Sequence, residues 1–143
     1  MNGTDDLTRF LEKQKNQYAI ALAEITRGRK LSHWMWYIFP QIKGLGSSEM
    51  ARFYGIKDVK EAKEYLEHPV LGKRLVQISQ VLLDLNSNNA NSIFGSPDDL
   101  KLKSCMTLFG LVSLESVFQK VLDKFFDGVK DERTLQIIGN KKF

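Results

Sequence analysis

The stretch His33-Trp34-Met35-Trp36-Tyr37-Ile38-Phe39-Pro40 decides how the rest of this sequence is interpreted. It is apolar without a clear period, and a run of this length before a proline fits a buried strand or two turns of buried helix. No other segment has the pattern of a partner strand, and Ser32 is a good helix N-cap. We therefore expect a short buried helix that starts after Ser32 and ends at Pro40.

The segment before this run has the pattern of one amphipathic helix over residues 5–27. Asp5 and Asp6 suit the positive end of the helix dipole, and Gly28 stands where a helix-ending glycine is expected. Gln14 is the one break in the apolar stripe. The stripe consists of Leu7, Phe10, Leu11, Tyr18, Leu22 and Ile25.

After Pro40, local start and stop signals predict the remaining helices. A loop is expected over 41–46, followed by a short helix that is capped by Ser47 or Ser48 and closed by Gly55. A helix then runs from the Asp58/Glu61 capping box to Glu67, and another runs from Pro69 to Leu85, with His68 near its cap and Gly72 as a close-packing position. After an Asn-rich loop over 86–89 and a single turn over 92–95, three more helices are expected: one capped by Ser96 that loosens at Gly110, one over 114–127, and a last one over 135–138 capped by Asp131.

Together these elements predict an all-α fold, a single compact irregular bundle of about seven to eight helices. One domain over residues 1–143 is expected, with about 5–138 ordered and 139–143 frayed. The helices are too unequal in length for a simple four-helix bundle.

The composition is that of an ordinary globular domain, with 43% hydrophobic and 27% charged residues among 143. A net charge of +4 permits an anionic partner without requiring one. Two histidines and one cysteine exclude a zinc ribbon and an internal disulfide, so no metal site and no cofactor are expected. The sequence shows neither a targeting signal nor a membrane span, so we expect a cytoplasmic protein without a membrane partner.

The densest candidate feature is the segment 27–55, because six of the fifteen aromatic residues lie between Trp34 and Tyr54. Aromatic faces stack on planar groups, and a glycine-rich turn before a helix offers backbone N–H groups to an anion. The alternative interpretation is that the aromatic run is core and that Gly44 and Gly46 only turn the chain. The core set would be Trp34, Met35, Tyr37, Ile38 and Phe39.

A second feature is the segment 98–109, in which Asp98, Lys101, Ser104 and Cys105 share one side of the expected helix. A lysine on a partly apolar stripe can be partly buried, which makes its pKa adjustable. The alternative is an ordinary surface pair between Asp98 and Lys101, with Cys105 as a small core residue.

Two motifs resemble one known family. They are W-x-W-x-x-F-P-Q over 34–41 and L-x-S-C-M-T-L-F over 102–109, and the segment 65–75 agrees with the same pattern. Over about residues 5–138 the chain resembles the domain of unknown function DUF1810. The resemblance implies a small all-α protein of bacterial type in the cytoplasm. It implies no activity and therefore no catalytic residue.

Our first hypothesis is a helical domain that binds a small planar anionic ligand of nucleotide type, with turnover left open because no known catalytic motif occurs. In it the aromatic rings stack, Lys43 and the helix start at Ser48 hold the anion, and Lys101 or His33 serves as acid or base. The expected site comprises His33, Trp36, Tyr37, Gln41, Lys43, Ser48, Lys101, Ser104 and Thr107.

The alternative is a protein-interaction module that uses an exposed aromatic patch around Trp36 and Tyr37. The shape of that surface discriminates between the two hypotheses. A concave pocket with converging polar groups favours a ligand, whereas a flat apolar patch favours a partner protein. A nucleic-acid interface would need one basic face and is the weakest of the three. The cations it would need are Arg27, Arg29, Lys30, Lys43 and Arg52. The expected oligomeric state is a monomer or a weak homodimer.

Overall fold

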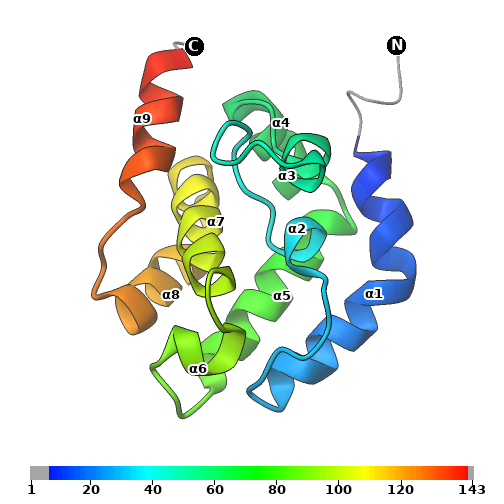
Figure 1. Cartoon of the computed structure of the whole chain (residues 1–143), viewed down its shortest axis with the longest axis vertical. Helices are drawn as coiled ribbons and strands as arrows, with labels where there is room; N and C mark the ends of the chain where they lie inside the picture. The colour runs from blue at the N-terminus through cyan, green and yellow to red at the C-terminus, as the bar shows by residue number, and fades with distance from the viewer. Residues whose placement is uncertain (1–6, 142–143) are drawn as a thin grey trace.

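The computed structural model describes residues 7–141, which form nine α-helices and no β-strand (Figure 1). The all-α prediction is confirmed, with one helix more than the upper number expected. The helices are α1 (Thr8–Thr26), α2 (Met35–Ile38), α3 (Glu49–Tyr54), α4 (Val59–Glu67), α5 (Leu71–Asp84), α6 (Ala90–Phe94), α7 (Asp98–Val112), α8 (Val117–Phe126) and α9 (Glu132–Lys141). None of these helices is long and apolar enough to cross a membrane.

Helices α5 and α7 form the centre of the bundle. Helix α5 packs against α1, α4 and α8, and α7 packs against α4, α6, α8 and α9. In Figure 1, α1 and α9 therefore stand at opposite edges, with the central helices between them. Helix α7 is buried almost all round from Ser104 to Phe109, and Cys105 within it is a core residue, as one interpretation of the sequence predicted.

A buried carboxylate joins the end of α1 to the segment that leads into α2. Glu24 is 4% exposed and accepts hydrogen bonds from the backbone N–H groups of Leu31 (2.8 Å) and Ser32 (3.0 Å). It also accepts from the Ser32 hydroxyl (2.5 Å) and from Nε1 of the Trp34 indole (2.9 Å). Gly28, with φ +85°, makes the turn that brings these donors back over the helix end.

This arrangement corrects the prediction for the aromatic run. The buried helix is present but spans only Met35–Ile38, and Ser32 is not its N-cap. The hydroxyl of Ser32 donates to Glu24, and Trp34 takes the N-cap position without a side-chain hydrogen bond. Because the Ser32 hydroxyl bonds to Glu24 instead of capping the helix, α2 begins two residues later than predicted.

The polar break in the α1 stripe is also part of the core. Gln14 is 2% exposed, and its Nε2 donates to the Tyr37 carbonyl (2.8 Å) and to the Tyr65 hydroxyl (3.0 Å). Its Oε1 accepts from Nη1 of Arg74 (3.3 Å). One amide thus connects α1 with α2, α4 and α5, and its polar atoms are satisfied inside the protein.

Several predicted helix starts are confirmed by side-chain caps. In each case a side chain accepts a backbone N–H three residues later, which satisfies a free donor of the first turn. The caps are Ser48 on α3, Asp58 on α4 and Asp131 on α9. Helix α5 instead begins at Leu71, two residues after the predicted start at Pro69, with Val70 in the N-cap position. The Nδ1 of His68 accepts the N–H groups of Val70 (3.1 Å) and Leu71 (3.3 Å) just before this helix.

Other predicted boundaries are wrong. Pro97 rather than Ser96 takes the N-cap position of α7, whose first turn instead has the Asp99 carboxylate accepting the Leu100 N–H. Helix α7 does not loosen at Gly110 but continues to Val112, where it packs on α8.

The remaining differences are at the starts and ends of three helices. Helix α6 begins at Ala90 because Asn89 caps it, and α8 begins at Val117, which leaves Leu114 fully exposed. Helix α9 spans Glu132–Lys141, so the tail expected to fray from residue 139 is helical as far as 141. Asp5, Asp6 and residues 142–143 lie outside the described residues.

The corner between α4 and α5 depends on a glycine. A Cβ atom at Gly72 would lie 1.9 Å from the carbonyl oxygen of Leu66, so the two helix ends approach closer than any side chain allows. The prediction of a close-packing position is confirmed. Gly110 in α7 differs, since a Cβ there would meet the Phe118 Cβ at 3.7 Å, an ordinary contact.

Substituting Glu24 should change how stability depends on pH. Burial raises the pKa of this carboxyl, but hydrogen bonds from Ser32, Leu31 and Trp34 outweigh burial and lower it to about 2, from an ordinary value of 4.5. A depressed folded-state pKa adds stability above the unfolded-state pKa, and this is lost as pH falls toward the folded value. We expect Glu24→Gln to cost about 3 kcal/mol at pH 7.

The cost should shrink between pH 4.5 and 2, because the protonated wild type then resembles the variant. Urea denaturation of both proteins across this range measures the difference. Glu64→Gln, at an exposed position on α4, serves as the control and should change stability little at any pH. A Glu24→Gln cost that stays constant down to pH 2 would contradict the role given to the carboxylate.

The two helical glycines should respond in opposite directions to alanine. Gly72→Ala should destabilise the protein by at least about 2 kcal/mol, because backbone must move to admit the methyl group. Gly110→Ala should stabilise it by about 0.5–1 kcal/mol through the better helix propensity of alanine. Thermal unfolding measures both, and equal effects of the two substitutions would show that the close approach at Gly72 is not needed.

Candidate functional site

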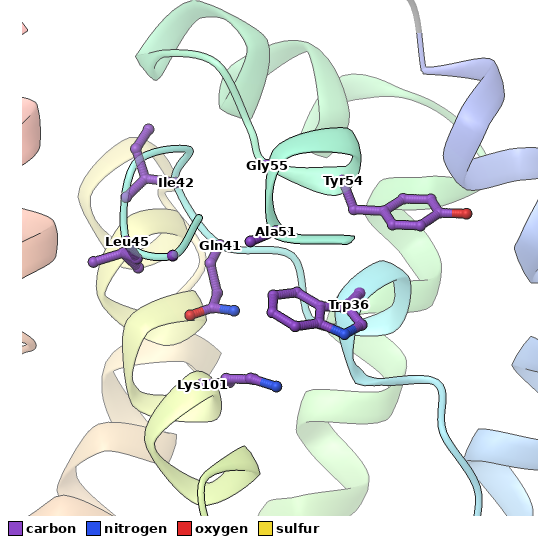
Figure 2. A pocket seen from close by; sticks show the side chains of 9 residues that line it. Trp36, Gln41, Ile42, Leu45, Ala51, Tyr54, Gly55 and Lys101 are labelled. Atoms are coloured by element: carbon purple, nitrogen blue, oxygen red, sulfur yellow. The ribbon is translucent and has the colours of Figure 1, made fainter. Parts of the chain in front are cut away.

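A cavity of about 120 Å³ lies where α2, α3 and the first turns of α7 meet the loop that follows α2 (Figure 2). It is the candidate site because it is lined by side chains from both segments that the sequence singled out. The lining residues are Trp36, Gln41, Ile42, Leu45, Gly46, Ala51, Tyr54, Gly55 and Lys101.

A cation–π contact in the site joins the two segments. The ammonium group of Lys101 lies 3.9 Å from the centroid of the Trp36 ring, a short cation–π distance. Figure 2 shows the side chains of Gln41 and Lys101 and the indole of Trp36 converging on one another. The ring of Tyr54 points away from this point, so Tyr54 contributes wall rather than a polar group.

Asp98 holds Lys101 in place. Its Oδ1 lies 3.1 Å from the Lys101 ammonium, and its Oδ2 lies 2.9 Å from the ammonium of Lys30. Burial raises the pKa of the Asp98 carboxyl, but the two lysines outweigh burial and lower it. The pair between Asp98 and Lys101 was the alternative interpretation of this segment, and it is present. Two ammonium groups share one carboxylate, so the cluster keeps a positive charge.

The wall opposite α7 is fastened by a single parallel bridge between Ile42 and Ile56. Lys43 N–H donates to the Ile56 carbonyl (2.7 Å), and Ile56 N–H donates to the Gln41 carbonyl (2.8 Å). A Cβ at Gly55 would lie 2.8 Å from the Lys43 Cα, so the backbone segments at Lys43 and Gly55 are in direct contact. The bridge fixes the position of Gln41 at the cavity.

Helix α9 supports the same wall from outside. The Arg133 Nη1 donates to the carbonyl of Leu45 at 3.1 Å, and a Cβ at Gly44 would meet the Ile137 Cδ1 at 3.5 Å. The glycine has φ +110°, a value that side-chain-bearing residues rarely adopt, so Gly44 makes the turn between Lys43 and Leu45. The C-terminal helix therefore positions one edge of the cavity.

Three of the nine predicted site residues line the cavity, namely Trp36, Gln41 and Lys101. Tyr37 is 4% exposed, packs on Tyr54 with ring centroids 5.3 Å apart, and its hydroxyl donates to the His33 carbonyl at 3.2 Å.

The other residues of the first segment do not line the cavity. His33, Lys43 and Ser48 are exposed, and the Ser48 hydroxyl is engaged as the cap of α3.

The hydroxyl groups of Ser104 and Thr107 serve the helix itself. Ser104 donates to the Leu100 carbonyl (3.2 Å) and Thr107 to the Lys103 carbonyl (2.8 Å). Thr107 Oγ1 also accepts the N–H of Asp131 at 2.8 Å, which ties α7 to the start of α9. Both side chains are buried away from the cavity.

The aromatic run divides between the two interpretations made from the sequence. Trp34, Met35, Tyr37, Ile38 and Phe39 are buried, so the core interpretation is correct for them. Trp36 alone is half-buried and faces the cavity.

The expected site left out two charged groups and most of the wall. The sequence singled out Asp98 on the second candidate segment and Lys30 among the cations near the aromatic run, but neither was placed in the expected site. The side chain of Lys30 is 8% exposed beside Asp98. The wall residues Leu45 and Ala51 gave no signal, because small and apolar side chains carry no chemical pattern, and Tyr54 was counted in the aromatic segment without being assigned to the site.

The site offers an ammonium group, an amide and an aromatic face, which are groups that bind and orient a ligand. The single cysteine, Cys105, lies elsewhere and is fully buried, and burial raises the pKa of its thiol well above the usual value. A buried thiol of this kind is a packing residue and not a nucleophile.

Removing the Lys101 side chain should uncover the Trp36 ring. Lys101→Ala should increase acrylamide quenching of tryptophan fluorescence, because the other tryptophan, Trp34, is fully buried and hardly quenched. The free energy of unfolding should fall by about 0.5–1 kcal/mol with the lost cation–π contact. Lys103→Ala, on the same helix over Phe126, is the matched control. Equal quenching in both variants would contradict the contact.

The comparisons with known proteins give one family match and one similar solved structure, and neither names an activity. The family described as "Protein of unknown function (DUF1810)" matches residues 4–138. A crystal structure of a conserved hypothetical protein from Mycobacterium tuberculosis, Rv1873, is 41% identical, with a TM-score of 0.92 over 94% of this chain and 96% of that chain. None of the curated proteins matches. Because the family match covers nearly the whole sequence, this chain belongs to the DUF1810 family.

Proposed function

We propose that this protein binds a small planar anionic ligand in the cavity beside Trp36. The planar group lies against the indole, and the anionic group pairs with Lys101. The observation that carries this proposal is the position of the Lys101 ammonium, 3.9 Å from the Trp36 ring at a concave surface that Gln41 also lines. A concave site with a few converging polar groups is typical of ligand binding.

Lys101 can serve an anion without giving up its partner. An ammonium group has three N–H donors, and one of them is directed at Asp98. The side chain is 20% exposed, so the charge is partly shielded from water and still reachable from the cavity. The ion pair fixes the ammonium before a ligand arrives, which lowers the entropic cost of binding.

The size of the cavity limits what enters it. At about 120 Å³ it is smaller than the roughly 150 Å³ that holds a benzene ring in an engineered core. It is far below the roughly 300–1,000 Å³ of sites that enclose drug-sized molecules. The cavity therefore encloses only part of such a ligand, and the rest of a nucleotide would lie outside it.

The two other hypotheses have less support at this site. An aromatic patch for a partner protein would need Tyr37 at the surface, but this residue is 4% exposed. The exposed apolar side chains nearby are Met50 and Phe53 on α3 instead. A nucleic-acid face would need Lys30, whose ammonium is paired with Asp98 at 2.9 Å.

A matched set of small ligands tests the proposal by thermal shift. Nicotinate carries both a ring and a carboxylate, nicotinamide has the ring without the charge, and acetate has the charge without the ring. Nicotinate and nucleoside monophosphates should raise the Tm, because a ligand that binds only the native state stabilises it. At a free ligand concentration of a hundred times Kd, the free energy of unfolding should rise by about 2.7 kcal/mol, which corresponds to a Tm increase of roughly 10 °C for a chain of this size.

The variants Trp36→Ala and Lys101→Met should abolish the shift, whereas Lys103→Met should keep it. The comparison of ligands separates the roles of the two groups, since loss at Trp36 should affect ring compounds most. The proposal fails if no compound of the set raises the Tm, or if both cavity variants keep the full shift.

A further inference from the structure

A second surface, at the opposite end of α7 from Lys101, carries the most exposed large apolar side chain in residues 7–141. Leu114, in the connection between α7 and α8, has a relative exposure of 107%, and Leu111 before it is 45% exposed. The periodicity of the sequence instead predicts Leu114 on the apolar face of a helix. The apolar surface of Leu114 stays in water in the single chain, so its burial against a partner would be favourable.

Leu114 stands at the edge of a groove of about 600 Å³ between α4, α5 and the α7–α8 connection. The groove has apolar walls, formed by the partly buried side chains of Leu66, Val76 and Val112. Gly72 adds no side chain to its floor, because the close approach of α4 and α5 excludes one. A protruding apolar side chain and a receiving apolar groove thus lie next to each other on one chain.

Both signs of charge line the same groove. Lys63 and Lys73 provide two cations, and Glu67 and Glu115 provide two anions. All four are exposed, and within residues 7–141 none of them is engaged in an ion pair. The groove is therefore rimmed by charges whose opposite partners are not supplied by the same molecule.

We infer that this groove is the interface of a homodimer, in which Leu114 of each copy enters the groove of the other. A twofold interface requires a surface that is complementary to itself. This surface meets that requirement twice, because it contains both the apolar knob and its groove, and equal numbers of lysine and glutamate around them. The dimer is weak, since one apolar anchor and a charged rim make a small interface.

The second copy is the occupant that accounts for the charges. A highly acidic or highly basic partner would leave two of the four rim charges facing a like charge, which disfavours binding. A second copy carries the same two lysines and two glutamates, so across a twofold axis each rim charge can be matched by an opposite one. This interface does not involve the cavity at Trp36, so a failure of the proposed ligand to bind would not affect the dimer inference, and the reverse also holds.

The first test is the oligomeric state of the full chain. Sedimentation velocity from micromolar to millimolar protein should show a concentration-dependent dimer. Leu114→Asp should weaken dimerisation by more than about tenfold, because it removes the central anchor and adds two carboxylates. Leu100→Asp, at a leucine of 57% exposure near the other end of α7, should leave the dimer unchanged. A monomer at every concentration, or a dimer that tolerates Leu114→Asp, would overturn the inference.

The second test reverses the rim charges and uses only exposed positions, so that folding is retained. A variant with Lys63→Glu and Lys73→Glu has an all-acidic rim, and a variant with Glu67→Lys and Glu115→Lys has an all-basic rim. Each should be monomeric alone, and a mixture should form a heterodimer at least as tight as the wild-type dimer. Circular dichroism checks that each is folded. If the mixture associates no more than either variant alone, the charge pairing across a twofold axis is wrong.

Discussion

The buried carboxylate of Glu24 is the interaction on which the candidate site depends. A charge removed from water is costly unless its oxygens are hydrogen-bonded, and the donors to this one all come from the segment that enters α2. The carboxylate thereby turns the indole of Trp34 into the core. Positions two apart on a helix face different sides, so fixing Trp34 inward leaves Trp36 directed at the cavity. A polar contact in the core thus aims an aromatic ring at the surface.

The helical fold could be predicted because most helix starts depend on local signals. Ser48, Asp58 and Asp131 each bond to a backbone N–H only three residues away, within the reach of a sequence pattern. Ser32 has the same kind of hydroxyl but bonds to a carboxylate of α1, and nothing in its neighbourhood reveals that choice. Gln14 looked like an interruption because its partners lie on α2, α4 and α5, at separations that no periodicity encodes.

The site could be predicted in part, and the reason differs from residue to residue. Trp36 and Lys101 could be proposed from their chemistry, but their contact depends on a tertiary fold that brings two segments distant in sequence together. Ser104 and Thr107 have equally suitable chemistry, yet their hydroxyls bond to carbonyl groups one turn earlier, as helical serine and threonine often do. Residue type selects candidates, whereas the surrounding backbone decides which of them face a ligand.

The contact between Gly72 and the Leu66 carbonyl also limits how this sequence can evolve. A chain that keeps the α4–α5 corner can change freely at exposed positions of either helix, but at position 72 it can accept no side chain without moving a helix. Position 72 is therefore expected to remain glycine for as long as the α4–α5 corner is kept. The same glycine also lines the groove beside Leu114. The shape of that groove therefore depends on the α4–α5 corner and cannot change at position 72 without changing the corner as well.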